Sequence, residues 1–263
     1  MRRNWEAIRI IWLRELLRFW RDRSRIAGAF IQPLVFLFIF GAGIASSIGR
    51  AQATGFDYIQ FIFPGVIGMT VMITAIFSGI SIVWDREFGF LREILVAPVP
   101  RWTIVLGKAL GGATVATIQG TILFLFSPFL GFGLDFLLLL KLIPLMLLLS
   151  FSVTSFGILV ASRMTSQQGF QFIVQALIFP MIFLSGAIFP LTSPPLWMKI
   201  ISTINPVTYG VDAFRQILLQ GKVAQAIFDQ LILHTLAYDI LLVAIFGLVI
   251  LILATYSFSQ TEA

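Results

Sequence analysis

The chain has 263 residues, of which 59% are hydrophobic and only 11% are charged, and its formal net charge is +6. Soluble domains carry about 25% charged residues, so this composition excludes an ordinary soluble fold, and its apolar and aromatic content excludes a disordered chain. The absence of cysteine and the single histidine, His234, exclude a disulfide framework, a thiolate metal site and a multi-histidine site. Eight of the 18 basic residues fall in the first 25 positions, which favours a membrane surface over nucleic acid as partner.

The N-terminal segment, positions 1–25, is predicted to form an interfacial amphipathic helix. Apolar residues recur every three or four positions, and arginines fall on the opposite side, as in a helix that lies at the headgroup boundary of a membrane. Two interpretations are open: a plain topology anchor, and a lever that bears on a cytosolic partner. The apolar side holds Trp5, Ile8, Trp12, Leu16 and Phe19, and the basic side holds Arg14, Arg18 and Arg21.

Six long apolar runs predict an all-α membrane protein with six transmembrane helices in one domain over residues 26–263. Each run lacks charge and exceeds about 18 residues, and a helix of about 20 residues crosses a bilayer. The runs do not alternate apolar and polar residues, as the strands of a membrane β-barrel do. The fifth run is too long for one span, and its prolines after position 189 are expected to end the helix. The runs cover 26–49, 58–84, 109–134, 142–162, 164–198 and 240–261.

Six spans place both termini on the same side of the membrane. With this topology, the side of the termini holds 13 of the 18 Lys and Arg residues, and the other side holds five. Cytoplasmic loops carry the excess of basic residues. We therefore expect both termini in the cytoplasm.

The loop between the second and third spans predicts a contact with another protein. It mixes three acidic residues and three arginines with apolar side chains that a solvated loop does not require. A short helix over residues 85–96 with this mixture suits the groove of a partner, and Pro98 and Pro100 are expected to end it. An amphipathic surface helix without a partner remains the alternative.

This loop resembles the loop after the second span in ABC transporter type-2 permeases, the membrane subunits of ATP-driven exporters. A second similarity is the Asn-Pro, Tyr and Arg pattern before the last span, at Asn205, Pro206, Tyr209 and Arg215. The small size resembles the drug-resistance and nodulation-factor export branch of the family. The loop residues that match the family pattern are Glu87, Gly89, Leu91, Arg92, Ala97, Pro98 and Arg101.

The resemblance implies a complex in the inner (plasma) membrane of two permease subunits, expected to be a homodimer, with two copies of an ABC ATPase subunit. ATP and Mg would be held by the ATPase, and this chain would bind no cofactor. The 190–237 region would form an external re-entrant element containing Asn205, Pro206, Tyr209 and Arg215; an ordinary external loop with two surface helices is the alternative. Within this region the sequence independently predicts two apolar pieces of helix length that are too short to span, Leu196–Ile204 and Asp212–Leu219. The predicted coupling residues are Arg86, Glu87, Gly89, Leu91, Arg92 and Glu93.

The sequence also indicates that the energy for transport comes from outside the chain. The six runs contain no ionisable residue, whereas proton relays place such residues at membrane depth. No phosphate-binding loop occurs, because Gly107-Lys108 lacks the flanking residues of that motif. Asp239 is expected to be an interfacial residue at the outer start of the last span. An ion-coupled carrier or channel is the main alternative, and an intramembrane enzyme would need a nucleophile and base that the runs lack.

Glutamines are the main polar side chains within the apolar runs. Gln168, Gln171 and Gln175 share one helical face of the fifth run, and Gln32 and Gln119 are isolated. Such residues serve either helix–helix hydrogen bonding or a path for an amphiphilic, lipid-like or glycan substrate; for the path we select Gln171 and Gln175. The glycines of the GxxxG sequence 107–111 are expected to serve local packing at the end of a span.

Overall fold

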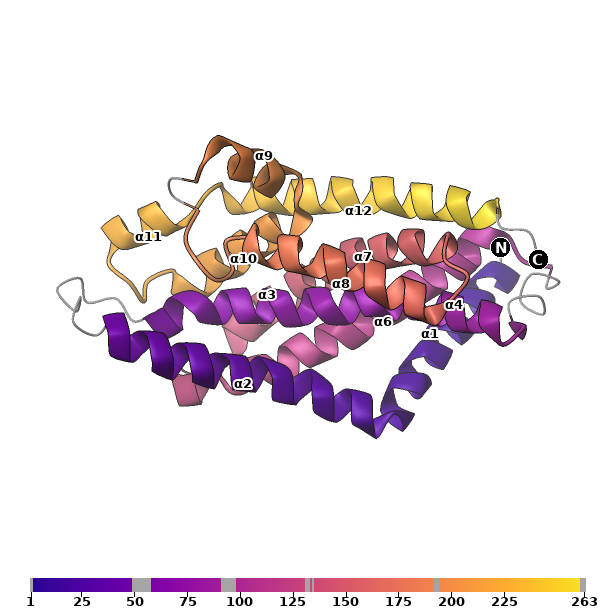
Figure 1. Cartoon of the computed structure of the whole chain (residues 1–263), viewed down its shortest axis with the longest axis horizontal. Helices are drawn as coiled ribbons and strands as arrows, with labels where there is room; N and C mark the ends of the chain where they lie inside the picture. Colours follow the sequence, from indigo (N-terminus) through magenta and orange to yellow (C-terminus); the bar gives the residue numbers. More distant parts are fainter. Residues whose placement is uncertain are drawn as a thin grey trace.

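The computed structural model describes residues 2–48, 58–90, 98–130, 133, 135–191 and 194–260, and all the regular elements in these ranges are helices. They form an elongated bundle, in which the start of α1 and the end of α12 lie at one end and α11 lies at the other (Figure 1). The helices are α1 Arg2–Arg21, α2 Arg23–Ile48, α3 Tyr58–Ser78, α4 Ile80–Glu87, α6 Arg101–Phe124, the 3-10 turn Ser127–Leu130, α7 Phe136–Ser162, α8 Gln167–Phe183, α9 Leu196–Ile204, α10 Pro206–Leu219, α11 Gln225–Leu231 and α12 Leu236–Ser259.

Three helical stretches in the described ranges are long and apolar enough to cross a membrane. They are Tyr58–Glu87, Phe136–Ser162 and Gln225–Ser259. They contain the predicted spans 58–84 and 142–162 and cover positions 240–259 of the predicted span 240–261. Residues Ile26–Ile39 and Gln167–Phe183 form shorter apolar helices within the first and fifth predicted spans. The all-helical class and three of the spans are therefore confirmed, and the full six-span layout stays a prediction.

The predicted boundaries of the third and fifth spans were wrong. Helix α6 begins at Arg101, directly after Pro100, and ends at Phe124, so it starts before the predicted position 109 and stops well before position 134. The early start places Lys108 inside the helix, where it is buried. Helix α8 ends at Phe183, before the prolines that were expected to end it.

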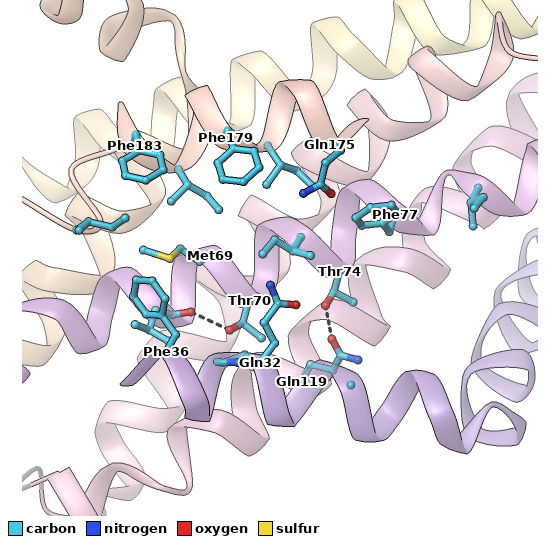
Figure 2. A pocket seen from close by; sticks show the side chains of 18 of the residues that line it. Gln32, Phe36, Met69, Thr70, Thr74, Phe77, Gln119, Gln175, Phe179 and Phe183 are labelled. Carbon is cyan, nitrogen blue, oxygen red and sulfur yellow. Dashed lines mark hydrogen bonds between the residues drawn. The ribbon is translucent and has the colours of Figure 1, made fainter. Parts of the chain in front are cut away.

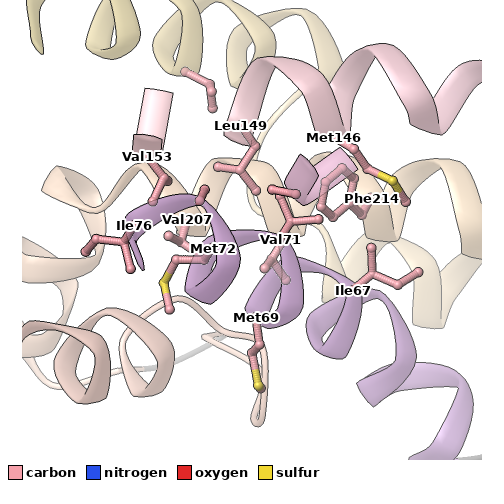
Figure 3. Packing of buried hydrophobic residues seen from close by; sticks show 14 of the residues in the cluster. Ile67, Met69, Val71, Met72, Ile76, Met146, Leu149, Val153, Val207 and Phe214 are labelled. Carbon is pink, nitrogen blue, oxygen red and sulfur yellow. The ribbon is translucent and has the colours of Figure 1, made fainter. Parts of the chain in front are cut away.

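Helix α3 is the central helix of the bundle. Its side chains Ile67, Met72 and Ile76 are fully buried and pack among residues of α7 and α10, such as Leu149 and Phe214 (Figure 3). Helix α3 belongs to the membrane-length stretch Tyr58–Glu87, and 83% of the most apolar part of this stretch is buried. In the stretch Gln225–Ser259, which contains α12, the corresponding share is 17%. Helix α12 is therefore a peripheral helix with an apolar surface suited to lipid, whereas α3 is enclosed by protein.

The central helix meets α7 so closely that only glycine fits at the contact. A Cβ atom on Gly157 of α7 would overlap the carbonyl oxygen of Ile76, and one on Gly79 would lie 2.5 Å from the carbonyl of Gly157. Because a side chain on either glycine would collide with backbone, α3 and α7 are in backbone contact here. This contact falls where α3 gives way to α4.

The end of the bundle opposite to the termini is built from short helices. The predicted apolar piece Leu196–Ile204 is confirmed as α9. The second piece was predicted at Asp212–Leu219, but α10 begins earlier, at Pro206, because the Asn205 side chain accepts a hydrogen bond from the Val207 amide and Pro206 takes the first helical position. The prediction that these helices form a re-entrant element in the membrane stays a prediction.

Helix α1 has the predicted helical form, but part of its predicted apolar face is covered by the protein itself. Ile8 and Phe19 from that face are buried within the protein, and only Trp5 is strongly exposed. A second apolar row is exposed instead, formed by Ile10, Leu13, Leu17 and Trp20. The prediction of a lipid-facing side was therefore wrong for Ile8 and Phe19, which are buried in protein, and Trp12 of the same side contacts α6.

Candidate functional site

The predicted coupling segment begins as a helix and then breaks. Helix α4 ends at Glu87, and Gly89 has a φ of 79°, in the left-handed region that favours glycine. A single helix over residues 85–96 was therefore a wrong prediction at this end, since the chain turns at Phe88 and Gly89. Glu87, Phe88, Gly89 and Phe90 are all exposed. The other predicted coupling residues, Leu91, Arg92 and Glu93, lie outside the described residues.

Arg86 contacts the protein itself. Its guanidinium donates to the backbone carbonyls of Ser162, at 2.9 Å, and of Met164, where α7 ends. These bonds satisfy carbonyl groups that a helix end leaves without partners. The coupling segment is thereby tied to the same end of α7 that leads into α8.

A buried group of charges joins α1, α4 and α6 at the end of the bundle that holds the termini; we call it the α1 junction. Asp85 and Lys108 are 1% and 2% exposed, and their Oδ2 and Nζ atoms are 2.7 Å apart. Arg14 of α1 donates to the same oxygen of Asp85 at 2.7 Å. Lys108 also contacts Ser81 Oγ at 2.9 Å and Glu15 Oε1 at 3.4 Å. The junction comprises Arg14, Glu15, Ser81, Asp85 and Lys108.

Each charge of the α1 junction has an opposite charge beside it. Burial alone acts to lower the pKa of Arg14, but the neighbouring carboxylate of Asp85 outweighs it and raises that pKa. A buried ion pair is stable only when its remaining donors and acceptors are also satisfied, and Ser81 and Glu15 contribute to this. The junction can therefore hold α1 in a defined position on the membrane helices.

Glycines allow α1 to lie close against α6. A Cβ on Gly107 would lie 2.9 Å from Ile11 Cβ, and one on Gly111 would lie 2.7 Å from Glu15 Cβ. Trp12 also donates its indole N–H to Thr114 Oγ1 at 3.0 Å. The local packing role predicted for the GxxxG sequence is confirmed, with α1 as the partner helix.

A cavity of about 560 Å³ opens between α2, α3 and α8, with contributions from α4 and α6. No charged residue is among the described residues that line it. Its wall is mainly apolar and aromatic, as in pockets for small molecules, and Figure 2 shows its labelled side chains pointing inward. The aromatic lining residues are Phe36, Phe77, Trp84, Phe179 and Phe183, and the polar ones are Gln32, Thr70, Thr74, Gln119 and Gln175.

Of the two glutamines selected for a substrate path, only one lies at the cavity. Gln175 lines it, whereas Gln171 is not among the lining residues, although both are exposed. Gln119, which the sequence left isolated, lies at the cavity with its carbonyl oxygen bonded to the Thr74 hydroxyl (Figure 2). Its amide nitrogen is buried without a hydrogen-bond partner in the described chain.

The predicted outer residues hold the opposite end of the bundle together. Asn205 donates to the Met181 carbonyl at 2.8 Å, and Tyr209 donates to the Thr203 carbonyl at 2.7 Å. Arg215 is 2% exposed, donates to the Gly186 carbonyl at 2.8 Å and lies over the Phe61 ring. Pro206 is buried at the start of α10. Burial lowers the pKa of Arg215 to about 10, and the charge of Asp212 opposes this shift.

Three buried charges that flank the apolar runs were not predicted from the sequence. Lys108 and Asp85 flank apolar runs and were assigned to a loop or a span end, and Asp239 was expected at the interface. Asp239 is in fact fully buried, because α10 packs against the start of α12. The position of each charge, directly beside a long apolar run, is the sequence signal that could have indicated its burial.

Comparison with known proteins identifies the chain. Residues 6–219 match the ABC-2 type transporter family. Nodulation protein J of Rhizobium leguminosarum bv. viciae is 29% identical over 225 residues, which cover 84% of each chain. The putative transport permease ycf38 of Cyanophora paradoxa is 34% identical over 187 residues, or 70% of this chain and 64% of that protein.

A third relative is the probable multidrug ABC transporter permease YbhR of Escherichia coli strain K12, which is 31% identical over 182 residues, or 66% of this chain and 48% of that protein. The three matches cover most of this chain, and they cover between 48% and 84% of the relatives' own lengths. The resemblance carried by the loop and the Asn-Pro motif is confirmed: this chain belongs to the ABC-2 type transporter family and is an ABC transporter permease of the membrane.

Proposed function

We propose that this permease is part of an exporter that moves an amphiphilic, lipid-like or glycan substrate across the inner (plasma) membrane. Two ABC ATPase subunits would supply the energy, and two copies of this chain would form the membrane part. Membership of the ABC-2 family supports an ATPase partner. The names of the relatives, a nodulation protein and a multidrug permease, support export as the direction.

The single observation that carries the proposal is the uncharged cavity. It is open to substrates with a large apolar part, and its glutamines and threonines offer hydrogen bonds without charge. Trp84 and Ile80 of α4 line the cavity, and Asp85 of the same short helix belongs to the α1 junction. A displacement of α1 or of the coupling segment would therefore change the wall of the cavity, and this is how ATP hydrolysis would act on the substrate.

An ion-coupled carrier or channel remains the alternative, and no observation favours it. Ion-coupled sites at membrane depth use ionisable groups or unwound backbone, and the described lining of the cavity is uncharged. ATP and Mg are assigned to the ATPase, and both termini of the permease to the cytoplasm, where the ATPase would bind Glu87, Gly89 and the residues that follow.

The proposal is tested with the permease and its ATPase partner in inside-out membrane vesicles, with a short-chain fluorescent lipid as transport probe. ATP-dependent uptake of the lipid is expected, and Glu87→Ala is expected to reduce it about tenfold without loss of the permease from the membrane. Asp229→Ala, an exposed acid at the other end of the bundle, is the control and should leave uptake unchanged. Uptake without nucleotide, driven by an ion gradient, would contradict the proposal, and equal uptake by Glu87→Ala would contradict the coupling assignment.

A further inference from the structure

Two carboxylates and one imidazole meet at the end of the bundle opposite to the termini. They come from α10, from the segment before α12 and from the first turn of α12: Asp212, His234 and Asp239. One potential ligand atom from each lies within 4.8 Å of the other two. His234 Nδ1 is 3.6 Å from Asp239 Oδ1.

Asp239 provides independent support for a ligand at this place. The residue is fully buried, and its Oδ1 has no hydrogen-bond partner in the described chain, whereas Oδ2 accepts from Gln216 at 2.8 Å. A buried carboxylate oxygen without a partner has a high desolvation cost. This oxygen faces the imidazole nitrogen, so the missing partner belongs between these two side chains.

The surrounding charges favour a cation. Asp212 and Asp239 are two buried carboxylates. Among the described residues, the one buried guanidinium beside them is that of Arg215, which attracts the Asp212 carboxylate electrostatically. Lys199 lines the pocket that opens beside His234, but it is exposed and its ammonium can remain in water.

The side chains are already held in position for such a role. Asp212 accepts from the backbone amides of Leu233 and His234 at 3.0 Å through Oδ2, which fixes the carboxylate against the segment that carries the imidazole. The imidazole lies against the rings of Tyr209 and Tyr238, with centroids 5.4 and 5.0 Å away. Hydrogen bonds and packing of this kind orient metal ligands in proteins.

We propose that Asp212, His234 and Asp239 bind a divalent transition-metal ion of the zinc class. One imidazole nitrogen and two carboxylate oxygens are typical protein ligands of zinc, with bonds of about 2.0–2.2 Å, so an inward shift of about 1 Å brings the three groups into range. The 440 Å³ pocket that His234 shares with Lys199 and Tyr209 gives a route of entry and leaves room for a water ligand. The ion links α10 to α12 and stabilises this end of the permease.

The experiment uses the full chain in lipid nanodiscs, stripped of metal and titrated with Zn²⁺, Co²⁺, Mg²⁺ and Ca²⁺. One Zn²⁺ per chain is expected to bind and to raise the melting temperature by roughly 5 °C, while Mg²⁺ and Ca²⁺, which prefer all-oxygen sites, have little effect. Bound Co²⁺ is expected to show visible absorption bands. His234→Gln is expected to weaken binding at least about tenfold and to remove these bands.

Two further variants keep the outcome decisive. Asp229→Asn removes an exposed acid of α11 and should bind Zn²⁺ as the wild type does. Asp239→Asn should lose metal binding, and because this buried variant can fail to fold, His234→Gln, whose side chain is 37% exposed, decides the case. Absence of stoichiometric binding in the wild type, or equal binding by His234→Gln, would overturn the proposal and leave a shared proton as the partner of Asp239.

Discussion

Lys108 is a buried cation whose presence inside the apolar helix α6 depends on its neighbours. Its ammonium has three donors, and the structure provides Asp85, Ser81 and Glu15 for them. A charge at this depth without such partners would be strongly unfavourable. The residue therefore reports directly on whether α1 and α4 are in place around α6.

Lys108→Met is expected to lower the free energy of unfolding by about 3 kcal/mol, since Asp85 stays buried and loses one of its two partners at 2.7 Å. The measurement is unfolding by denaturant in mixed micelles. Lys141→Met provides the matched control, because Lys141 is exposed in α7, and its effect should be small. If both variants unfold alike, the buried ion pair does not contribute to stability.

Gly89 is expected to matter through its backbone alone. Its φ is 79° and a Cβ there would meet no atom within 4 Å, so Gly89→Ala should cost about 1 kcal/mol from left-handed strain. Gly28→Ala in α2 also meets no atom but lies in a regular helix, where alanine is preferred. Thermal unfolding should therefore shift down for Gly89→Ala and not for Gly28→Ala, and a shift of the same sign in both would rule out the turn.

At the scale of the elements, α1 is a helix docked on the protein. Its buried face fits over the glycines of α6, its arginines reach Asp85, and its exposed row of Ile10, Leu13, Leu17 and Trp20 remains for lipid or a partner. A force on α1 would therefore be transmitted to α6 and α4 directly. This arrangement supports the lever interpretation of the N-terminal helix over the plain anchor.

Gly111→Val is expected to push α1 away from α6, because a Cβ at this position lies 2.7 Å from Glu15 Cβ. Overpacking of this kind costs about 1–3 kcal/mol, and ATP-dependent transport should fall with it. Gly28→Val carries the same change in helix propensity at an open position and serves as control for the cleavage measurement alone, because Gly28 lines the cavity. Protease cleavage between α1 and α2 reads out the separation, and equal cleavage in the two variants would show that α1 does not depend on this contact.

At the scale of the whole molecule, the bundle has two different ends. One end holds the termini, the α1 junction and the coupling segment, and the other holds α9, α10, α11 and the buried residues Asp212 and Asp239 (Figure 1). The cavity lies between them. Such a division suits a permease that is driven from one side and closed on the other.

The orientation of the bundle can be tested because the chain has no cysteine. Single cysteines at two exposed sites, Glu6→Cys in α1 and Gln220→Cys after α10, would be treated with a membrane-impermeant maleimide in intact spheroplasts. Gln220→Cys should react and Glu6→Cys should react only after lysis, since the basic side faces the cytoplasm. The reverse pattern would invert the predicted topology.

The sequence by itself determined that the chain belongs in a membrane, that it is helical, and to which family it belongs. Long apolar runs leave a helix in lipid as the way to satisfy the backbone, and short motifs such as Asn205-Pro206 act locally as a helix cap. Helix α9 was likewise predicted with its observed bounds. These features depend on residues that are neighbours along the chain, so they can be predicted from the sequence.

Only the tertiary structure decided which faces and charges are buried. The apolar side of α1 was assigned to lipid, because a hydrophobic pattern does not distinguish lipid from protein as its partner. Asp85 and Lys108 lie on different helices, as do Asp212 and Asp239, so the contacts within each pair depend on how the helices pack. Gln175 and Gln171 share one sequence pattern, but only the rotation of α8 against α2 and α3 places one of them at the cavity.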